Sequence, residues 1–330
     1  MPRIAGGTFL ITGGASLVGS YIADALLAQG AKEIRLLDTL ALGSTEMVGH
    51  LLNDTRVKLI RGDVTQLDDV VNAATGADGV FALAAFLTIS MAQNPALGVT
   101  INNMGIVNTV EACRIAKVKR IIFASSVGAY GLPTADVITE ETPFTSAGAS
   151  PAFVLYSASK LTGEALCAHY QKAHGVEFNA LRISSVYGAR QHNRAVNANF
   201  ILQVHDRIRR GEAPVILGDG KEVHDYIYVS DVADAAAIAM SSPSHGHVLN
   251  IATGIDTNLT RVTEIVLEVC NARHLKPLYR ADDRAVKAST VTHLNFSRAK
   301  AEKTIGWTPK ISIEDGLRRT IAWRDSRGKS

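Results

Sequence analysis

Tyr156 and Lys160 are the residues whose types and spacing most directly suggest chemistry. They stand four positions apart in the segment YSASK, so a helix would place both side chains on one face. A neighbouring ammonium group stabilises the phenolate form of a tyrosine and lowers its pKa, which makes Tyr156 a candidate general base. Because such pairs also arise by chance, the weight of this one depends on the elements around it.

Two hydroxyl groups precede this pair at the end of an expected strand. The apolar run 120–124 leads into Ser125 and Ser126. A parallel sheet binds its ligands at the carboxyl edge, where its strands end. We therefore expect these hydroxyls to face a ligand.

A glycine-rich turn near the start of the chain predicts a dinucleotide site. The segment TGGASLVG (12–19) joins an expected strand to an expected helix, where glycines let backbone N–H groups and the helix N-terminus approach a pyrophosphate. Asp38 ends the next strand, 25 residues after Gly13. A carboxylate there accepts hydrogen bonds from an adenosine ribose and repels a 2′-phosphate. With Asp63 and Val64 bordering the adenine, the pattern favours NAD over NADP.

The elements that must position these residues follow a regular alternation. The expected strands of the first half are 8–12, 34–37, 57–60, 80–84, 120–124 and 176–182. The expected helices between them are 16–29, 101–116 and 151–172. Later elements are helix 197–210, strand 214–217, strand 226–229 and helix 231–240. This alternation is typical of an α/β fold with a doubly wound parallel sheet.

The length of 330 residues suggests about two domains. The strands and helices that alternate after about residue 180 can add strands to the first sheet. We therefore expect the segments of the two domains to be interleaved along the chain. Residues 1–183 plus about 222–252 would form the NAD-binding domain. Residues from about 184–221 plus 253–330, mostly helical toward the end, would form a second, smaller domain, which the family resemblance given below implies is substrate-binding.

Charge and composition exclude several classes of partner. The 34 Lys and Arg residues against 31 Asp and Glu leave a net charge of +3, too small an excess to imply nucleic acid or a polybasic membrane contact. No apolar run reaches the roughly 18 residues of a membrane span, so no membrane partner is expected. The three cysteines lack CxxC spacing, which favours a reducing cytoplasm. His245 and His247 lack a third ligand in their loop, so no metal is expected.

The order of the motifs along nearly the whole chain resembles a known family. The motifs are TGGASLVG (12–19), Asp38, SSVGAYG (125–131), YSASK (156–160), LRISSVYG (181–188), GDGKEVHDYIYVSDVA (218–233), LNIATG (249–254) and IGWTP (305–309). Together they resemble the extended short-chain dehydrogenase/reductases. Within that group the chain is most similar to the NAD-dependent sugar-nucleotide epimerases and dehydratases, with UDP-glucose 4-epimerase as prototype.

The resemblance implies a fold, a reaction and a set of roles. It implies a Rossmann domain for NAD, a smaller, mainly helical α/β C-terminal domain for a small-molecule substrate, and a homodimer formed through a four-helix bundle. The substrate would be a nucleotide-activated sugar. Tyr156 would take a hydroxyl proton while NAD takes the hydride, Lys160 would hold the nicotinamide ribose, and Ser126 would hydrogen-bond the reacting oxygen. The transient ketone would then receive the hydride on its other face.

Binding residues are carried over motif by motif from the same resemblance. Those expected to line the cofactor are Gly13, Ser16, Leu17, Val18, Gly19, Asp38, Asp63, Val64, Leu83, Ala84, Ala85, Asn102, Ser125, Tyr156 and Lys160. Those expected to contact the substrate are Ser126, Ser185, His224 and Arg280.

Departures from the family pattern narrow the reaction. Dehydratases of this family carry an Asp-Glu pair directly after the catalytic Ser or Thr, because eliminating water needs a second acid and base. Here those positions are Val127 and Gly128, which disfavours dehydration and also decarboxylation, for which the family uses a Glu there. Ser16 replaces the second glycine of the turn, so we expect weaker or repositioned NAD binding.

His224 occupies the place of an arginine that in the family grips the nucleotide diphosphate. Histidine is not a permanent bidentate phosphate ligand. The sequence therefore supports a UDP-sugar as the substrate less strongly than the family resemblance does. Ser184 and Ser185 replace a polar-aromatic pair, which indicates an altered sugar pocket. Three arginines could supply phosphate contacts or simply be solvated surface charges: Arg190, Arg280 and Arg284.

These observations leave three hypotheses of different kinds. The leading one is a redox-neutral NAD-dependent epimerase of a nucleotide-activated sugar. The second, suggested by His224, is a net NAD-dependent dehydrogenase of a smaller alcohol or a non-nucleotide sugar. The third is a redox sensor that binds NAD and a protein partner, against which the intact pair of Tyr156 and Lys160 counts.

Overall fold

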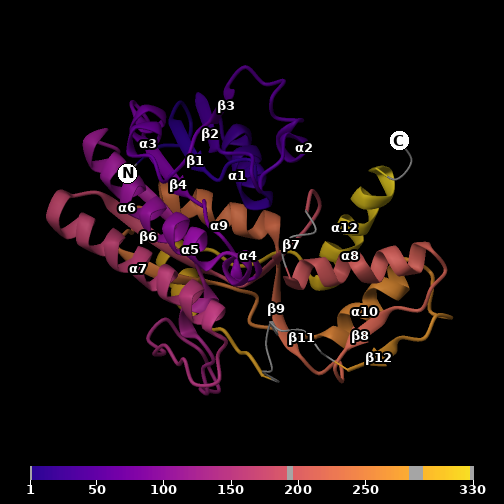
Figure 1. Cartoon of the computed structure of the whole chain (residues 1–330). Helices are drawn as coiled ribbons and strands as arrows, with labels where there is room; N and C mark the ends of the chain where they lie inside the picture. Colours follow the sequence, from indigo (N-terminus) through magenta and orange to yellow (C-terminus); the bar gives the residue numbers. More distant parts are fainter. Residues whose placement is uncertain (1, 192–195, 282–292, 328–330) are drawn as a thin grey trace.

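Seven parallel strands form the central sheet of the computed structural model, which describes residues 2–191, 196–281 and 293–327 (Figure 1). Their order across the sheet is β10-β6-β5-β4-β1-β2-β3. The strands are β1 (Thr8–Thr12), β2 (Glu33–Asp38), β3 (Val57–Arg61), β4 (Gly79–Ala82), β5 (Arg120–Ser126), β6 (Glu177–Ile183) and β10 (His247–Ile251). This arrangement confirms the prediction of a doubly wound α/β fold.

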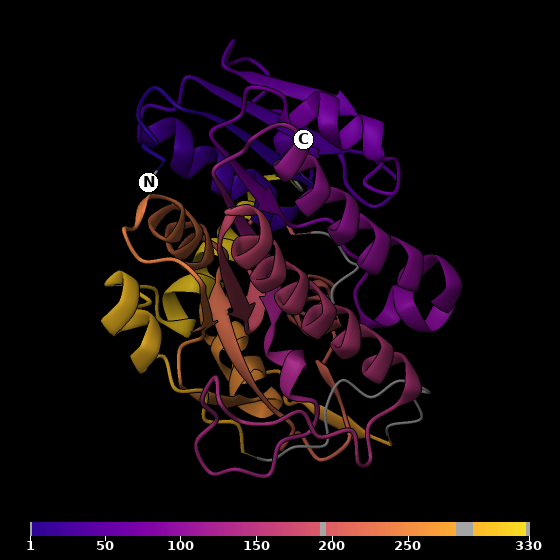
Figure 2. The same cartoon turned by 90° about the vertical axis from the view of Figure 1, so that its left-hand side faces the viewer.

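Helices cover both faces of this sheet, and each face has its own apolar core. The helices of the described residues are α1 (Leu17–Ala28), α2 (Thr45–Val48), α3 (Leu67–Ala74), α4 (Thr88–Gln93), α5 (Pro95–Val99), α6 (Gly105–Ile115), α7 (Pro151–His174), α8 (Val196–Arg209), α9 (Val229–Ser241), α10 (Leu259–Val269), α11 (Ala299–Ile305) and α12 (Ile313–Arg327). Phe9 and Ile11 of β1 pack with α1 and α9, whereas Leu10 packs with α3, α6 and α7. Figure 2 shows α6 and α7 crossing the face turned to the viewer. Because both faces of β1 are buried, its sequence shows no alternation of apolar and polar residues.

Two shorter helical turns interrupt the regular elements beside the site. The π-helical turn η1 (Thr100–Met104) precedes α6, and the 3₁₀ turn η2 (Val127–Tyr130) follows β5. The helix expected over 101–116 therefore begins as a π-helix. Within the described residues, no helix combines the length and apolar character that crossing a bilayer requires.

Five short strands form two further sheets next to the large one. They are β7 (Ser185–Tyr187), β8 (Val215–Leu217), β9 (Val223–Tyr228), β11 (Asp256–Asn258) and β12 (Leu278–Arg280). β9 lies between β7 and β11, and β8 pairs with β12. The helices α8, α10 and α12 pack on this region through one apolar cluster. β9 thus lies outside the large sheet, whereas β10, which follows it in the chain, joins that sheet.

The chain passes between the large sheet and the three-stranded sheet three times, and one carboxylate joins the crossing points. Asp225 on β9 accepts hydrogen bonds from the Ser184 hydroxyl at 2.8 Å, the Thr253 N–H at 2.9 Å and the Gly254 N–H at 2.6 Å. Burial raises the pKa of this carboxyl group, while these three donors act in the opposite direction. The carboxylate therefore ties the exits of β6 and β10 to β9.

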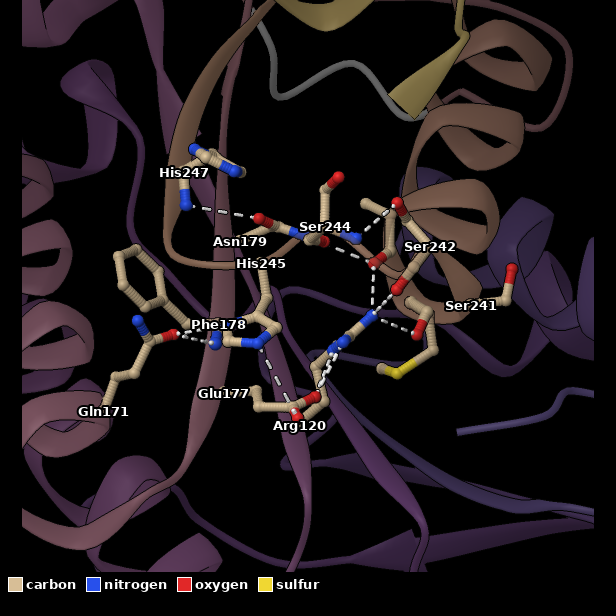
Figure 3. A network of polar contacts seen from close by, with 12 residues as sticks. Arg120, Gln171, Glu177, Phe178, Asn179, Ser241, Ser242, Ser244, His245 and His247 are labelled. Carbon is tan, nitrogen blue, oxygen red and sulfur yellow. Dashed lines mark hydrogen bonds and ion pairs between the residues drawn. The ribbon is translucent and has the colours of Figure 1, made fainter. Parts of the chain in front are cut away.

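At the amino ends of the strands, Arg120 closes the C-terminus of α9 (Figure 3). Its side chain is 1% exposed, and its Nη1 donates to the carbonyls of Ala239 at 3.3 Å and Met240 at 2.9 Å. Nε and Nη2 donate to Glu177. A cation at this end of a helix complements the helix dipole. His245 belongs to the same polar network, where its Nδ1 lies 3.1 Å from an oxygen of the Gln171 side chain.

Candidate active site

Tyr156 and Lys160 lie on the first half of α7, which packs directly against β5. Both side chains are buried, at 8% and 6% exposure. Gly163 permits the close approach, because a Cβ there would lie 2.2 Å from the ring of Phe123 on β5. The helix therefore brings the pair to the carboxyl end of the strand, where the Ser126 hydroxyl acts on the pKa of Tyr156.

The ionisation of this pair is set by burial. The Lys160 Nζ donates to the Ala124 carbonyl at 2.8 Å and lies 5.5 Å from the centre of the Tyr156 ring. Burial lowers the pKa of Lys160 to about 8, although the Glu164 carboxylate acts in the opposite direction. Burial also raises the pKa of Tyr156, against the opposite effect of the neighbouring Ser126 hydroxyl. Tyr156 therefore needs the positive charge of a bound group to become a base near neutral pH.

The lowered pKa of Lys160 predicts a pH-dependent stability of the cofactor-free protein. Between about pH 8 and 10.5 the unfolded chain keeps the Lys160 proton that the folded chain has released. Because the unfolded state then binds more protons, this residue adds stability as the pH rises through that window. We expect urea unfolding to show wild type gaining stability relative to Lys160→Met from pH 8 to pH 10. Lys172→Met, an exposed change on the same helix, is the control. Wild type should gain no stability relative to Lys172→Met over this pH range, and a gain equal to that over Lys160→Met would contradict the prediction.

A buried ion pair lies beneath the site and joins three elements. Glu164 on α7 accepts two hydrogen bonds from Arg182 on β6, at 2.8 and 2.7 Å, and their side chains are 8% and 9% exposed. The Ser125 hydroxyl on β5 donates to the same carboxylate at 2.5 Å. The Arg182 guanidinium also lies 4.5 Å from the centre of the Tyr130 ring. This network fixes the end of β5 relative to α7, and sequence analysis missed it.

The turn η2 packs closely beside Tyr156, where Gly128 has no side chain to add. A Cβ at Gly128 would lie 3.2 Å from Cε1 of the Tyr156 ring and 3.3 Å from the Ser126 Oγ. The Ser126 Oγ accepts a hydrogen bond from the Gly128 N–H at 3.0 Å. Because positions 127 and 128 are Val and Gly, this turn places no acid next to the tyrosine.

The glycine-rich turn has the close packing that a dinucleotide cradle needs. Gly13 has a φ of +66°, and a Cβ there would lie 2.9 Å from the backbone of Ala84. A Cβ at Gly19 would lie 2.6 Å from the carbonyl oxygen of Gly14. The turn thus sits against the Leu83–Ala85 segment after β4, with the N-terminus of α1 directed at the space that a pyrophosphate would take. These residues fit NAD.

Ser16 is accommodated in this turn as the N-cap of α1. Its hydroxyl accepts a hydrogen bond from the Gly19 N–H at 3.1 Å. The hydroxyl therefore accepts from one N–H group at the helix N-terminus. The N–H groups of Leu17 and Val18 are the other donors of the first turn. The expected weakening of NAD binding stays a prediction.

Asp38 and the residues around the adenine side are held by backbone contacts. The Asp38 carboxylate accepts hydrogen bonds from the Ala15 N–H at 3.0 Å and the Leu40 N–H at 2.8 Å. Asp63 accepts from the Thr65 N–H at 2.8 Å, and the carbonyl of Val64 accepts from the Asn108 side chain. The carboxylate expected to bind the ribose is thus fixed at the end of β2.

Asn102 connects the cradle to the Tyr-Lys pair. From η1, its side chain accepts from the Phe86 N–H at 2.7 Å and donates to the Phe86 carbonyl and to the Ser159 hydroxyl. A small cavity reaches from Thr12 past Ala84 and Asn102 to Lys160. The structure therefore brings most of the expected cofactor residues to one continuous edge of the sheet. Thr12 and Ser159 also line this cavity, although sequence analysis gave neither a role.

The expected substrate residues are spread more widely. His224 is 5% exposed, and its Nε2 lies 2.7 Å from Oε1 of Glu222. Ser185 on β7 pairs in register with Tyr226, two residues along β9 from His224. Arg280, in contrast, is exposed on β12, which pairs with β8 in a separate two-stranded sheet. Arg190 donates to Asp24 on α1, and Arg284 lies outside the described residues.

Known proteins resemble the chain over nearly its whole length. It is 29% identical over 324 residues to a putative UDP-glucose 4-epimerase of Methanocaldococcus jannaschii, a match that covers 97% of this chain and 99% of the relative. The solved UDP-N-acetylglucosamine 4-epimerase of Methanobrevibacter ruminantium, in complex with UDP-N-acetylmuramic acid, superposes with a TM-score of 0.87 at 26% identity, covering 98% of this chain and 99% of that one. The UDP-glucose 4-epimerase of Thermus thermophilus, solved with NAD, gives 0.81 at 29% identity and covers 96% and 99%.

A family model supports the same assignment. The model described as the NAD dependent epimerase/dehydratase family matches residues 9–252. That range includes the glycine-rich turn, Ser126 and both Tyr156 and Lys160. The match covers well over half of the chain, so this protein belongs to the NAD-dependent epimerase/dehydratase family, and its cofactor is NAD.

Proposed function

We propose that the protein is an NAD-dependent epimerase that inverts a hydroxyl-bearing carbon of a nucleotide-activated sugar without net oxidation. The observation that carries the proposal is the arrangement at the end of β5. Ser126, Tyr156 and Lys160 are brought together there, while the adjoining turn holds Val127 and Gly128 in place of acids.

The chain's own residues account for the proton steps. NAD in the cradle supplies reversible hydride transfer. Tyr156 takes the proton of the substrate hydroxyl and later returns it, while the ammonium of Lys160 stabilises the phenolate. Ser126 hydrogen-bonds the reacting oxygen and keeps it near the Tyr156 Oη. Because the transient ketone can be reduced on either face, the product differs from the substrate only in configuration.

Dehydration and decarboxylation are disfavoured by the same turn. Eliminating water requires a second acid and base near the adjacent carbons. Glu164, the acid that contacts Ser125, is committed to Arg182. A longer side chain at position 128 would also press against the Tyr156 ring.

A second candidate, net NAD-dependent oxidation of a smaller alcohol or a non-nucleotide sugar, has one observation in its favour. The buried His224 ring faces the Glu222 carboxylate at 2.7 Å. A carboxylate beside this histidine opposes the binding of a diphosphate at that position. The two candidates differ in whether NADH accumulates.

The proposal is tested by incubating the purified protein with UDP-glucose, UDP-galactose and their N-acetyl and uronate relatives, with NMR of the products. We expect at least one pair to interconvert without accumulation of NADH, measured by absorbance. Turnover of none of these sugars would overturn the proposal. NADH formed in proportion to an oxidised smaller substrate would establish the second candidate instead.

We also propose a homodimer and the interleaved domain division given above. Apolar side chains on α5, η1, α6 and α7 are more than a third exposed, as expected for a face that a second copy covers: Leu97, Met104, Ile115 and Leu155. For the domains, the membership of β10 in the large sheet supports an interleaved chain path, although β9, at residues 223–228, pairs with β7 and β11.

A further inference from the structure

Arg190, in the turn that follows β7, has a backbone conformation that its residue type seldom adopts. Its φ is +69°, in the left-handed region where a residue other than glycine is strained. Such strain persists only where surrounding contacts hold it, and it points to a function for the residue. β7 belongs to the three-stranded sheet and lies below α1 and α2 in the view of Figure 1. The partners of the Arg190 side chain among the described residues nevertheless lie on the side of the large sheet.

Three side chains hold the Arg190 guanidinium. Its Nη2 donates to Oδ2 of Asp24 at 2.6 Å, and its Nη1 donates to Nε2 of His50 at 2.7 Å. The central guanidinium carbon lies 3.7 Å from the centre of the Tyr21 ring, well within the range of a cation–π contact. Tyr21 and Asp24 are on α1, and His50 follows α2. The Arg190 side chain, 15% exposed, therefore joins α1 to the end of α2, and its charge is committed to these partners and not to a phosphate.

The two elements joined in this way border the NAD site. α1 begins at the glycine-rich turn, and the segment 39–50, which contains α2, follows the carboxylate of Asp38. The near end of this segment is fixed on the cradle, because the Ser44 N–H donates to the Ala15 carbonyl at 3.1 Å. A Cβ at Gly43 would lie 2.9 Å from either oxygen of the Asp38 carboxylate. The segment 39–50 therefore packs directly against the carboxylate that is expected to bind the ribose.

The far end of the segment 39–50 depends on Arg190. The His50 side chain is 44% exposed, and its Nε2 also lies 3.1 Å from Oδ1 of Asp24. An exposed pair of this kind contributes little by itself. The Arg190 guanidinium adds two donated hydrogen bonds and covers the ring of Tyr21, three residues before Asp24 on α1. It thus fixes the segment to α1 at a second point.

We propose that Arg190 is a positioning residue for NAD, supplied by the segment that follows β7. By fastening the segment 39–50 to α1, it keeps the Asp38 carboxylate and the N-terminus of α1 in one fixed arrangement. Loss of Arg190 leaves both of these cofactor contacts in the protein but lets them move relative to each other. Affinity then falls because the site is less preorganised, although no NAD ligand has been removed. The expected effect is a rise of about threefold to tenfold in the dissociation constant of NAD.

Equilibrium dialysis of the full-length protein against a series of NAD concentrations tests the proposal, with bound NAD quantified after release by acid. We expect Arg190→Met and Arg190→Gly to raise the dissociation constant equally, because both remove the guanidinium. Glycine adopts a positive φ without strain, so the thermal midpoint of Arg190→Gly should be at least that of Arg190→Met. Arg319→Met is the matched control. The Arg319 guanidinium lies 5.8 Å from the centre of the ring of Tyr228, which belongs to β9 and not to α1.

A double-mutant cycle shows whether Arg190 acts through its contact with α1. Asp24→Asn alone should weaken NAD binding, and combining it with Arg190→Met should weaken binding little further, because both changes break the same contact. Arg190→Lys keeps the charge but lacks the planar fork, so it should restore part of the affinity. An unchanged dissociation constant in Arg190→Met, equal weakening by Arg319→Met, or full additivity with Asp24→Asn would overturn the proposal. The measurement uses no sugar, so its failure is distinguishable from failure of the proposed function.

Discussion

Replacement of Tyr156 by phenylalanine is expected to lower kcat/KM about 10²–10⁴-fold, the range that a positioned general base contributes. The change removes only the hydroxyl group, on whose pKa the neighbouring Ser126 hydroxyl acts. The ring stays packed beside Gly128, so the fold and NAD binding should persist. Kinetics with the sugar identified by NMR would measure the loss, and the thermal midpoint would verify folding.

Tyr170→Phe is the matched control for this variant. Tyr170 lies on the same helix, where its hydroxyl donates to Glu111 at 2.9 Å, far along α7 from the site. Its loss should leave kcat/KM within about twofold of wild type, because it contacts no reacting group. If Tyr156→Phe kept comparable activity, another residue would have to be the base.

Replacement of Glu164 by glutamine is expected to lower the free energy of unfolding by about 3–5 kcal/mol, the usual effect of removing one partner of a buried ion pair. The substitution leaves the Arg182 guanidinium buried without its counter-charge, at 9% exposure. It also removes the charged acceptor of the Ser125 hydroxyl. Urea unfolding at neutral pH would measure the change.

An exposed ion pair provides the comparison for Glu164. Glu268 lies 3.0 Å from Arg273, with side chains 40% and 74% exposed. Glu268→Gln should change the free energy of unfolding by at most about 1 kcal/mol, because solvent screens the pair. Equal losses in the two variants would show that the Glu164 network adds nothing beyond an ordinary surface contact.

The large sheet was predictable from the sequence because its central strands are covered on both faces. β1 begins and ends at the predicted residues, Thr8 and Thr12, which flank three apolar ones. The short strands were harder, because β11 and β12 have three residues each and show no periodicity. β9 begins at Val223, three residues before the predicted start. The polar residues at its beginning do not look like a strand in the sequence, because their partners lie far along the chain, as in the contact of Asp225 with Thr253.

The chemistry of the site was predictable where it depends on local spacing. Tyr156 and Lys160 share a helix face, and Ser126 ends a strand, so their meeting follows from the order of elements. The ion pair of Glu164 and Arg182 spans 18 residues, and neither residue is distinguishable in sequence from a surface charge. Only the packing of α7 against β5 and β6 shows that this pair is buried.

The bonds of Asp225 limit how the two parts of the molecule can move. A cleft between domains joined by one linker opens by a swing about that linker. Here Ser184, Thr253 and Gly254, from two of the three crossings, are fastened to a single carboxylate on the third. Such a swing would have to stretch or break three hydrogen bonds at once. We therefore expect substrates to enter through movement of loops at the rim, with the two sheets keeping a fixed mutual orientation.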